Sequence, residues 1–339
     1  MRIAIQSYNN FGQNTAGGVR TKIFNYVDSL AAFPDVECKM FDKWHDKLAD
    51  FDILHCFALK EEIYDQVRLA RSLGKKVVIS SIVPLSKPNW IKFNLFLGRK
   101  FNIRNVYYLN ALTLDMTDAV ITETGKEKEF VRDVYGVEPE RIFTIPNGVS
   151  TDVQGGDPAL ARERFGFEKE CIVHVSRIDR NKNQLNVIRA LRNTDIPVVF
   201  LGGPDTTDMA YYEQCRAEAT PNMFFAGWVQ HDDPLFASTL AAAKVSVLPS
   251  YNEVFGNAIY EGLLAGCNVV ATNVVPVSEW GLEKDVISID PSSVEDIRRG
   301  ILAAYEKPRN PQVVEKVSSI FSFRAIAQQH VDLYRKILA

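Results

Sequence analysis

Short runs of consecutive apolar residues alternate along the chain with longer stretches in which apolar positions recur every three or four residues. The first pattern is typical of strands buried on both faces of a parallel sheet, and the second of amphipathic helices. An amphipathic stretch at 20–32 follows the first apolar run, and helical patterns separate several of the others. The predicted strands are 2–6, 36–40, 53–57, 77–80, 119–122, 142–145, 171–175, 198–201, 223–226, 245–248 and 268–271.

This alternation occurs twice, and the two halves are separated by a polar, glycine-rich segment. Pro-Asn-Gly at 146–148 is a strong turn signal, and 148–158 has the composition of a linker. A chain of 339 residues also fits two domains of about 150 residues each. Strands separated by helices predict parallel sheets with right-handed crossovers. We therefore expect two doubly wound α/β domains that face a central cleft, the default location of a ligand site.

Composition narrows the class of protein without identifying it. With 46% hydrophobic residues, 24% charged residues and a net charge of −3, the chain resembles an ordinary cytoplasmic globular protein, and no nucleic-acid partner is expected. It contains no run of 18 apolar residues and no secretory leader pattern. The five histidines lack metal-ligand spacing. The five cysteines lack a C-x-x-C pair and are expected to be buried free thiols: Cys38, Cys56, Cys171, Cys215 and Cys267.

Two carboxylates lie between two predicted strands in the segment SYNEVFGNAIYEGLLAGCNVVATN, residues 250–273. Glu253 is in the loop after the strand 245–248. Glu261 is within a helix expected to begin at about Phe255 and to end at Gly266. Ligands of open parallel sheets bind at the carboxyl ends of the strands, and the free amides of a helix start attract anions. Glu253 is therefore a candidate ligand-binding residue.

Two further loops carry groups that suit an anion. Gly17 and Gly18 follow the first strand and precede a helix, where glycine allows backbone amides to approach a phosphate. Taken alone, this pair is explained more often by a plain loop, because neither G-x-G-x-x-G nor the P-loop pattern is present. Arg177 and Lys182, in VSRIDRNKNQ, follow the strand 171–175 and suit phosphate oxygens. A solvated charged loop explains this second pair equally well.

In combination, these motifs resemble family 4 of the retaining nucleotide-sugar glycosyltransferases, which have the GT-B fold. The E-x7-E element of that family, with its Phe-Gly core, matches Glu253, Phe255, Gly256 and Glu261. Its Arg-x4-Lys element matches Arg177 and Lys182, and its N-terminal Gly-Gly loop matches Gly17 and Gly18. Its Pro-Asn-Gly turn matches 146–148, and its last helix, which crosses back to the N-terminal domain, matches 321–339.

The resemblance implies both a domain division and roles for individual residues. Two Rossmann-like domains are expected: 1–148 with 322–339 for the acceptor, and 149–321 for the nucleotide sugar. Glu261 would bind the ribose hydroxyls and Glu253 the transferred sugar, while amides near Phe255, Gly256 and Asn257 face sugar and phosphate. The base would lie near Trp228 and Val229. Arg177 and Lys182 would neutralise the leaving diphosphate, the charge stabilisation that such a reaction needs most.

The chain also departs from the family pattern. Many members carry a histidine after the fourth strand, where this sequence has Ser80 and Ser81. His55 is not a replacement, because it lies in an apolar strand and is expected to be a core residue. The family reaction is often described with the donor phosphate accepting the proton, which requires no side-chain base. Asp50-Phe51-Asp52 precedes a strand instead of following one, so we expect a turn there, no metal site and no cofactor.

The implied function is retaining transfer of a sugar from a nucleoside-diphosphate sugar to a glycan or lipid-linked acceptor, in surface polysaccharide or glycoconjugate synthesis. Two alternatives from other classes stay open. One is a different GT-B activity, such as a nucleotide-sugar epimerase or a phosphorylase. The other is a non-catalytic GT-B subunit that stabilises a partner enzyme, an alternative favoured by the missing histidine.

The charge distribution suggests a further partner. Residues 66–114 contain nine basic residues and no acidic one. Within them, NWIKFNLFLGRKF places Trp90, Phe93, Leu97 and Phe101 on one helical face, with Lys92 and Arg99 nearly opposite. Either this aromatic stripe packs on its own sheet, or it edges a basic surface that meets an anionic membrane or a lipid-diphosphate-linked glycan. The second interpretation predicts peripheral association with the inner face of the membrane.

Overall fold

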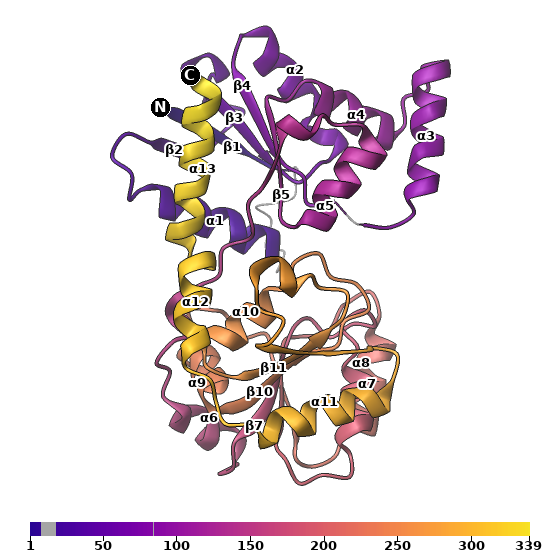
Figure 1. Cartoon of the computed structure of the whole chain (residues 1–339), viewed down its shortest axis with the longest axis vertical. Coiled ribbons are helices and arrows are strands. Elements are labelled where there is room, and N and C mark those ends of the chain that lie inside the picture. Colours follow the sequence, from indigo (N-terminus) through magenta and orange to yellow (C-terminus); the bar gives the residue numbers. More distant parts are fainter. Residues whose placement is uncertain (8–17, 84) are drawn as a thin grey trace. The chain divides into compact units, whose positions relative to one another are not determined.

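The computed structural model describes residues 1–7, 18–83 and 85–339 (Figure 1). The chain forms two compact units, Met1–Gly148 with Phe323–Ala339, and Val149–Ser322. The domains expected from the sequence are 1–148 with 322–339, and 149–321. Gly17 lies outside the described residues, and Gly18 is the first residue of a helix.

Unit 1 is built on a six-stranded parallel sheet with the order β2-β1-β3-β4-β5-β6. Because β1 pairs with both β2 and β3, the strand order reverses between β1 and β3. The strands are β1 (Arg2–Gln6), β2 (Glu37–Met40), β3 (Ile53–Phe57), β4 (Lys76–Ser80), β5 (Ala119–Thr122) and β6 (Ile142–Thr144). The principal helices are α1 (Gly18–Leu30), α2 (Tyr64–Ser72), α3 (Pro88–Phe101), α4 (Val106–Asp115), α5 (Gly125–Phe130) and α13 (Phe323–Leu338).

Both faces of the unit 1 sheet are buried, as the continuous apolar runs predict. Alternate residues of β3 point to opposite faces: Leu54 belongs to a core with side chains of α2 and α4, and Phe57 to a core with side chains of α1 and α13. Figure 1 shows α1 and α13 on one side of the strands and α4 on the other. The C-terminal helix therefore completes the core of unit 1.

Buried hydrogen bonds link α13 to the unit 1 sheet. The hydroxyl of Tyr334 shares a short hydrogen bond with that of Tyr26 and lies 2.6 Å from His55 Nδ1. His55 Nε2 lies 2.9 Å from the Oγ of Ser80. His55 has no exposed surface, and burial holds its pKa well below the ordinary value, so the imidazole is neutral. The prediction that His55 is a core histidine is confirmed.

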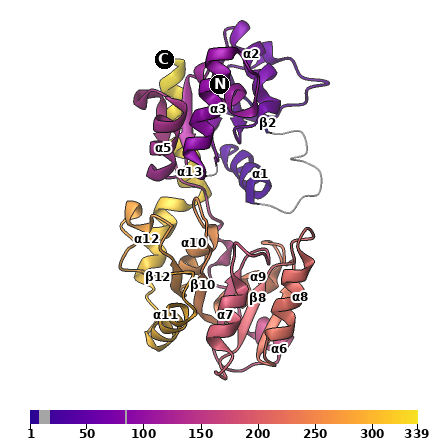
Figure 2. The same ribbon diagram turned by 90° about the vertical axis from the view of Figure 1, so that its right-hand side faces the viewer.

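Unit 2 has a second six-stranded parallel sheet, with the order β12-β11-β10-β7-β8-β9, and its helices cover both faces (Figure 2). Its strand order reverses between β7 and β10. The strands are β7 (Cys171–Val175), β8 (Val198–Leu201), β9 (Met223–Gly227), β10 (Ala243–Leu248), β11 (Asn268–Thr272) and β12 (Val286–Ile289). The helices are α6 (Pro158–Phe165), α7 (Gln184–Leu191), α8 (Met209–Glu218), α9 (Pro234–Ala242), α10 (Asn257–Leu264), α11 (Val294–Glu306) and α12 (Gln312–Phe321).

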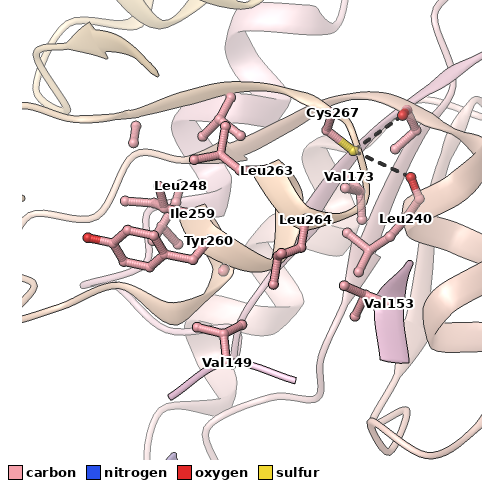
Figure 3. Packing of buried hydrophobic residues seen from close by; sticks show 14 of the residues in the cluster. Val149, Val153, Val173, Leu240, Leu248, Ile259, Tyr260, Leu263, Leu264 and Cys267 are labelled. Carbon is pink, nitrogen blue, oxygen red and sulfur yellow. Dashed lines mark hydrogen bonds between the residues drawn. The ribbon is translucent and has the colours of Figure 1, made fainter. Parts of the chain in front are cut away.

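The two sheets confirm the predicted α/β class, but one strand was missed and one segment was wrongly assigned. Strand β12 was missed because its short sequence is only half buried. The segment 148–158 is not a free linker, because Val149 and Val153 belong to the hydrophobic cluster of unit 2, which Figure 3 shows together with α10. The last helix predicted at 321–339 is present as α13 (Phe323–Leu338), and Ser322, which pairs with Val149 in a β-bridge, separates it from α12.

The structure also shows the state of the cysteines and the character of the helices. All five cysteines are free thiols and four of them are buried, as expected; Cys38 is partly exposed. Throughout the described residues, no helix has the length and apolar character needed to cross a bilayer.

Candidate active site

The loop between β7 and α7 carries Arg177 and Lys182, and one carboxylate organises both of its ends. Asp179 Oδ2 accepts a hydrogen bond of 2.9 Å from Arg177 Nε, and its Oδ1 accepts one of 2.9 Å from the backbone N–H of Lys182. Asp179 is buried, and the Arg177 side chain is half exposed. The loop thus holds the guanidinium in a fixed position while leaving donor groups open to solvent. The sequence motif identified the two cations but not Asp179.

Asparagine side chains fix this loop to the loop that follows β10. Asn183, in a left-handed conformation with φ of 65°, donates to the carbonyl oxygens of Pro249 at 3.0 Å and Pro291 at 2.7 Å. Asn181 donates to the carbonyl oxygen of Asn252 at 2.9 Å and accepts from its N–H at 2.9 Å. The loops at the carboxyl ends of β7 and β10 therefore form one hydrogen-bonded structure, at the position where the strand order reverses.

Lys182 and Glu253 meet where these two loops join. The ammonium of Lys182 donates a short hydrogen bond to Glu253 Oε1, and both side chains are largely buried. Beneath them, His174 Nε2 lies 3.0 Å from the carbonyl oxygen of Lys182. Burial lowers the pKa of His174 to about 4, so at neutral pH it is uncharged and donates this hydrogen bond. The backbone at Lys182 is therefore held from both sides, by Asp179 and by His174.

The first turn of α10 follows directly from the Glu253 loop. Gly256 caps the helix with φ of 78°, a left-handed conformation that glycine adopts without strain. The helix begins at Asn257, two residues later than predicted. The Phe255 side chain is buried, with its ring 4.4 Å from that of Tyr260, so it packs in the core of unit 2. Any contact of Phe255 with a ligand must therefore use its backbone.

Glu261 lies one turn into α10, on a helix that is buried from Ala258 to Leu264. Figure 3 shows its neighbours Tyr260, Leu263 and Leu264 within the apolar cluster. Glu261 is only 5% exposed, and its Oε1 lies 3.1 Å from Nε2 of His231, in the segment after β9. A carboxylate in such surroundings requires polar partners. His231 could not be identified from the sequence, because it stands alone among polar residues.

The pair formed by His231 and Glu261 makes stability depend on pH. The hydrogen bond to Glu261 raises the pKa of His231 above its ordinary value of 6.5. When folding raises a pKa, the protonated group stabilises the folded state. This contribution is fully present below about pH 6.5, the unfolded pKa, and is lost as the pH rises through the folded pKa. Because the His231 side chain is 43% exposed, we expect the pair to contribute only about 0.2–1 kcal/mol to the free energy of unfolding. The unfolding free energy of wild type should exceed that of His231→Gln more at pH 5.5 than at pH 8.5.

Trp228 and Val229 follow β9, next to a pair of glycines at the end of β8. A Cβ on Gly203 would lie 2.1 Å from Trp228 Nε1, and one on Gly202 would lie 1.9 Å from the carbonyl oxygen of Ser176. The missing side chains thus allow the indole and the β7 loop to approach this strand end. Trp228 is 51% exposed, whereas Val229 packs against the hydrophobic cluster. Of the two residues expected near the nucleotide base, only Trp228 presents a large exposed side-chain surface.

Unit 1 has its own polar cluster at the carboxyl ends of its strands. Lys22 on α1 donates a hydrogen bond of 2.5 Å to Glu123, which follows β5, and both residues are buried. Glu127 accepts from Ser81 Oγ at 2.8 Å and from the N–H of Glu123 at 2.7 Å. Sequence reasoning missed this cluster, although Thr124-x-x-Glu127 is a helix-start signature that could have located it. Ser80 and Ser81, which replace the family histidine, both make internal hydrogen bonds.

The Asp50-Phe51-Asp52 segment lies at the opposite edge of the sheet. Asp52 Oδ2 accepts a hydrogen bond of 2.7 Å from the N–H of Arg2, at the amino end of β1. The predicted turn is present, since Leu48–Asp50 forms one turn of 3-10 helix. In the described part of the chain, no three His, Cys, Asp or Glu side chains are grouped so that they could hold a metal ion.

Comparisons with known proteins agree with the two-unit architecture. Residues 19–153 match the model of Glycosyltransferase Family 4, and residues 160–318 match that of Glycosyl transferases group 1. Similar solved structures include HepE of Anabaena in complex with UDP and glucose, with a TM-score of 0.77 at 14% identity over 99% of this chain and 100% of that chain. These likenesses show that the chain has the predicted GT-B fold.

Curated relatives match shorter segments. A D-inositol 3-phosphate glycosyltransferase of Acidothermus cellulolyticus is 33% identical over 174 residues, which are 46% of this chain and 38% of the relative. An alpha-maltose-1-phosphate synthase of Mycolicibacterium smegmatis is 25% identical over 273 residues, 68% of this chain and 66% of the relative. The chain thus spans less than two thirds of the length of these relatives.

Proposed function

We propose that this protein transfers a sugar from a nucleoside-diphosphate sugar to an acceptor hydroxyl, with retention of anomeric configuration. The chain belongs to the glycosyltransferases of group 1 and family 4. The acceptor is a glycan or a lipid-linked glycan, in surface polysaccharide or glycoconjugate synthesis. The names of the relatives support the general activity, because one is a glycosyltransferase and the other is a synthase of a sugar phosphate.

One observation carries this proposal: the cations and the carboxylates singled out in the sequence gather along the β7 and β10 loops of unit 2. Lys182 contacts Glu253, Arg177 is held on the same loop by Asp179, and Glu261 lies one helical turn beyond the start of α10. A nucleotide sugar needs this combination, because its diphosphate requires cations and its hydroxyls require acceptors. In the absence of donor, Lys182 and Glu253 neutralise one another; a bound diphosphate would take over Lys182 and leave Glu253 to accept from sugar hydroxyls.

The reaction follows from these roles. The bond between the anomeric carbon and the diphosphate oxygen breaks, and the acceptor oxygen forms its new bond on the same face of the sugar. The acceptor proton passes to an oxygen of the departing diphosphate, so no side-chain base is required. Arg177, Lys182 and the amides at the start of α10 would stabilise the charge that develops on that diphosphate. We propose that no metal ion or other cofactor takes part.

The proposal is tested first by thermal unfolding against a panel of UDP-, GDP-, ADP- and TDP-sugars. A donor at about 100 times its Kd should raise the midpoint by roughly 5–10 °C. With that donor and a lipid-linked glycan acceptor, free nucleoside diphosphate should be released, turnover should survive a metal chelator, and NMR should show that the new glycosidic bond has the anomeric configuration of the donor.

The same assays separate the alternatives. Binding of a nucleotide sugar without release of nucleotide under any acceptor would favour the non-catalytic subunit. Conversion of the donor into its epimer in the absence of acceptor would favour the epimerase. An inverted product, or a strict requirement for a divalent metal, would contradict the proposed reaction.

A further inference from the structure

Helix α3 and the residues that follow it expose a concentration of large apolar side chains. Six of the fifteen exposed large hydrophobic residues found across the described chain lie between 90 and 106, and each is 39% to 58% exposed. They are Trp90, Phe93, Phe96, Phe101, Ile103 and Val106. Grouped exposed apolar residues mark interaction sites more often than scattered ones do.

The buried face of α3 is a different one. Ile91, Leu95 and Gly98 point inward, and a Cβ on Gly98 would lie 2.5 Å from the side chain of Tyr108 on α4. The Asn105 side chain donates a hydrogen bond of 3.0 Å to the carbonyl oxygen of Asn94 and accepts one of 3.0 Å from the N–H of Tyr108. Figure 1 shows α3 at the margin of unit 1, beyond α4. Of the two interpretations left open by the sequence, packing of the aromatic stripe on its own sheet is therefore excluded: α3 is anchored through Ile91, Leu95 and Gly98, and its aromatic residues are exposed.

The basic residues of 66–114 divide into two groups. Near α2 and β4, Arg68 pairs with Asp65, while Arg71 and Lys76 pair with Asp118. The other group lies on or beside α3 and consists of Lys87, Lys92, Arg99, Lys100 and Arg104. As far as the structure describes the chain, no carboxylate forms a salt bridge with any of these five cations. Lys75, near β4, also forms no salt bridge and donates to the carbonyl oxygen of Ala49. Among the described residues, five of the six cations of 66–114 that form no salt bridge therefore lie at α3.

A groove runs along the basic side of α3. It has a volume of about 520 Å³, and Lys92, Phe96, Arg99 and Lys100 line it opposite residues 133–136. Its one acidic lining residue, Asp133, is already paired with Arg132 at 2.6 Å. Arg99 donates to the carbonyl oxygen of Tyr135 at 3.3 Å, which holds the guanidinium at the groove. The groove thus offers cations to an anionic group of headgroup size.

We propose that this face, named here the α3 surface and made of the six apolar residues and five cations above, binds an anionic phospholipid bilayer. Charge complementarity identifies the occupant, because unpaired cations next to exposed Trp and Phe suit the interface where lipid phosphates meet acyl chains. The aromatic residues lie at headgroup depth, and the groove takes a lipid phosphate. This inference does not depend on the proposed function, since binding needs neither donor nor acceptor.

The test is cosedimentation of the full chain with vesicles of phosphatidylcholine, with and without 30% phosphatidylglycerol. Wild type should bind the anionic vesicles at low salt and lose most of that binding at 0.5 M salt, because salt screens the attraction. Lys92→Ser, Arg99→Ser and Lys100→Ser together should weaken binding by roughly 100-fold, since each basic residue near anionic lipid contributes about 5-fold. Trp90 should also be quenched by brominated lipid, and this quenching should disappear in Trp90→Phe.

A matched control changes three exposed basic residues of unit 2, Arg192, Lys284 and Lys307, to Ser, so that net charge falls equally. The control should bind anionic vesicles within about 3-fold of wild type, and thermal unfolding should show that both triple variants are folded. Equal weakening by the two triple variants would overturn the proposal, as would wild type that ignores anionic vesicles at low salt. Binding to a soluble polyanion alone, or self-association through α3 without vesicle binding, would assign the surface to another partner and overturn it too.

Discussion

Lys182→Ala is expected to lower turnover at saturating donor by about 10²- to 10³-fold, the loss typical when one preorganised charge-stabilising donor is removed. Lys182 is held in place by three contacts: its N–H bonds to Asp179, its carbonyl accepts from His174, and its ammonium contacts Glu253. The two backbone contacts keep Lys182 in position when its ammonium exchanges Glu253 for the bound diphosphate, so little reorganisation remains when charge develops on the leaving group. Donor affinity, measured by calorimetry, should fall much less than single-turnover rate.

Arg180→Ala is the matched control for this prediction. Arg180 lies on the same loop, but its guanidinium turns away to Asp208, at 2.6 Å, and over the ring of Tyr211. We expect its turnover to stay within a few-fold of wild type. Because Lys182→Ala also leaves Glu253 without its cation, the double variant Lys182→Ala with Glu253→Gln separates the two effects. If the double variant recovers the unfolding midpoint but not the rate, the loss of turnover is due to the missing cation. If turnover is unchanged in Lys182→Ala, Lys182 takes no part in the mechanism.

The sequence predicted most strands because their pattern is dictated by burial on both faces. The predicted bounds of β1, β3, β5, β7 and β8 match the structure at both ends, because each strand has a run of apolar residues that is interrupted or flanked by at most two polar ones. β12 was missed because Ser288, which is exposed in the structure, interrupts its apolar residues and leaves too short an apolar run. Val149 and Val153 were assigned to a linker because the polar and glycine residues around them dominate the local composition. Their burial depends on α10, which is far away in the sequence.

The candidate site divides in a similar way. Residues identified by motif, such as Arg177, Lys182 and Glu253, fall on two loops whose proximity follows from parallel strand order. Their partners Asp179 and His231 could not be inferred, because each is identified only by a contact in three dimensions. The exposed side of α3 was undecided for a similar reason. Its aromatic residues repeat at helical spacing on either interpretation, and the outcome depended on Gly98 packing against Tyr108.

Glu261→Ala should weaken binding of the donor nucleotide by about 10- to 150-fold, because a hydrogen bond to a charged group is worth about 1.5–3 kcal/mol. The substitution should leave the fold intact, since alanine is a good helix former and α10 is otherwise packed through its apolar residues. Glu213→Ala, which removes an exposed carboxylate on α8, is the control and should bind as wild type does. Calorimetry with the nucleoside diphosphate identified by the donor panel gives both affinities.

The assignment of Glu261 to the ribose is tested more sharply by changing the ligand. Wild type should bind the 2′- and 3′-deoxy forms of the nucleotide less tightly than the ribonucleotide, whereas Glu261→Ala should no longer distinguish at least one of them. This cycle isolates the contact between carboxylate and hydroxyl, because a general loosening of α10 would weaken all three ligands alike. His231→Gln should keep the discrimination, since the carboxylate remains. If Glu261→Ala still discriminated both deoxy forms as wild type does, Glu261 would not be the ribose-binding residue.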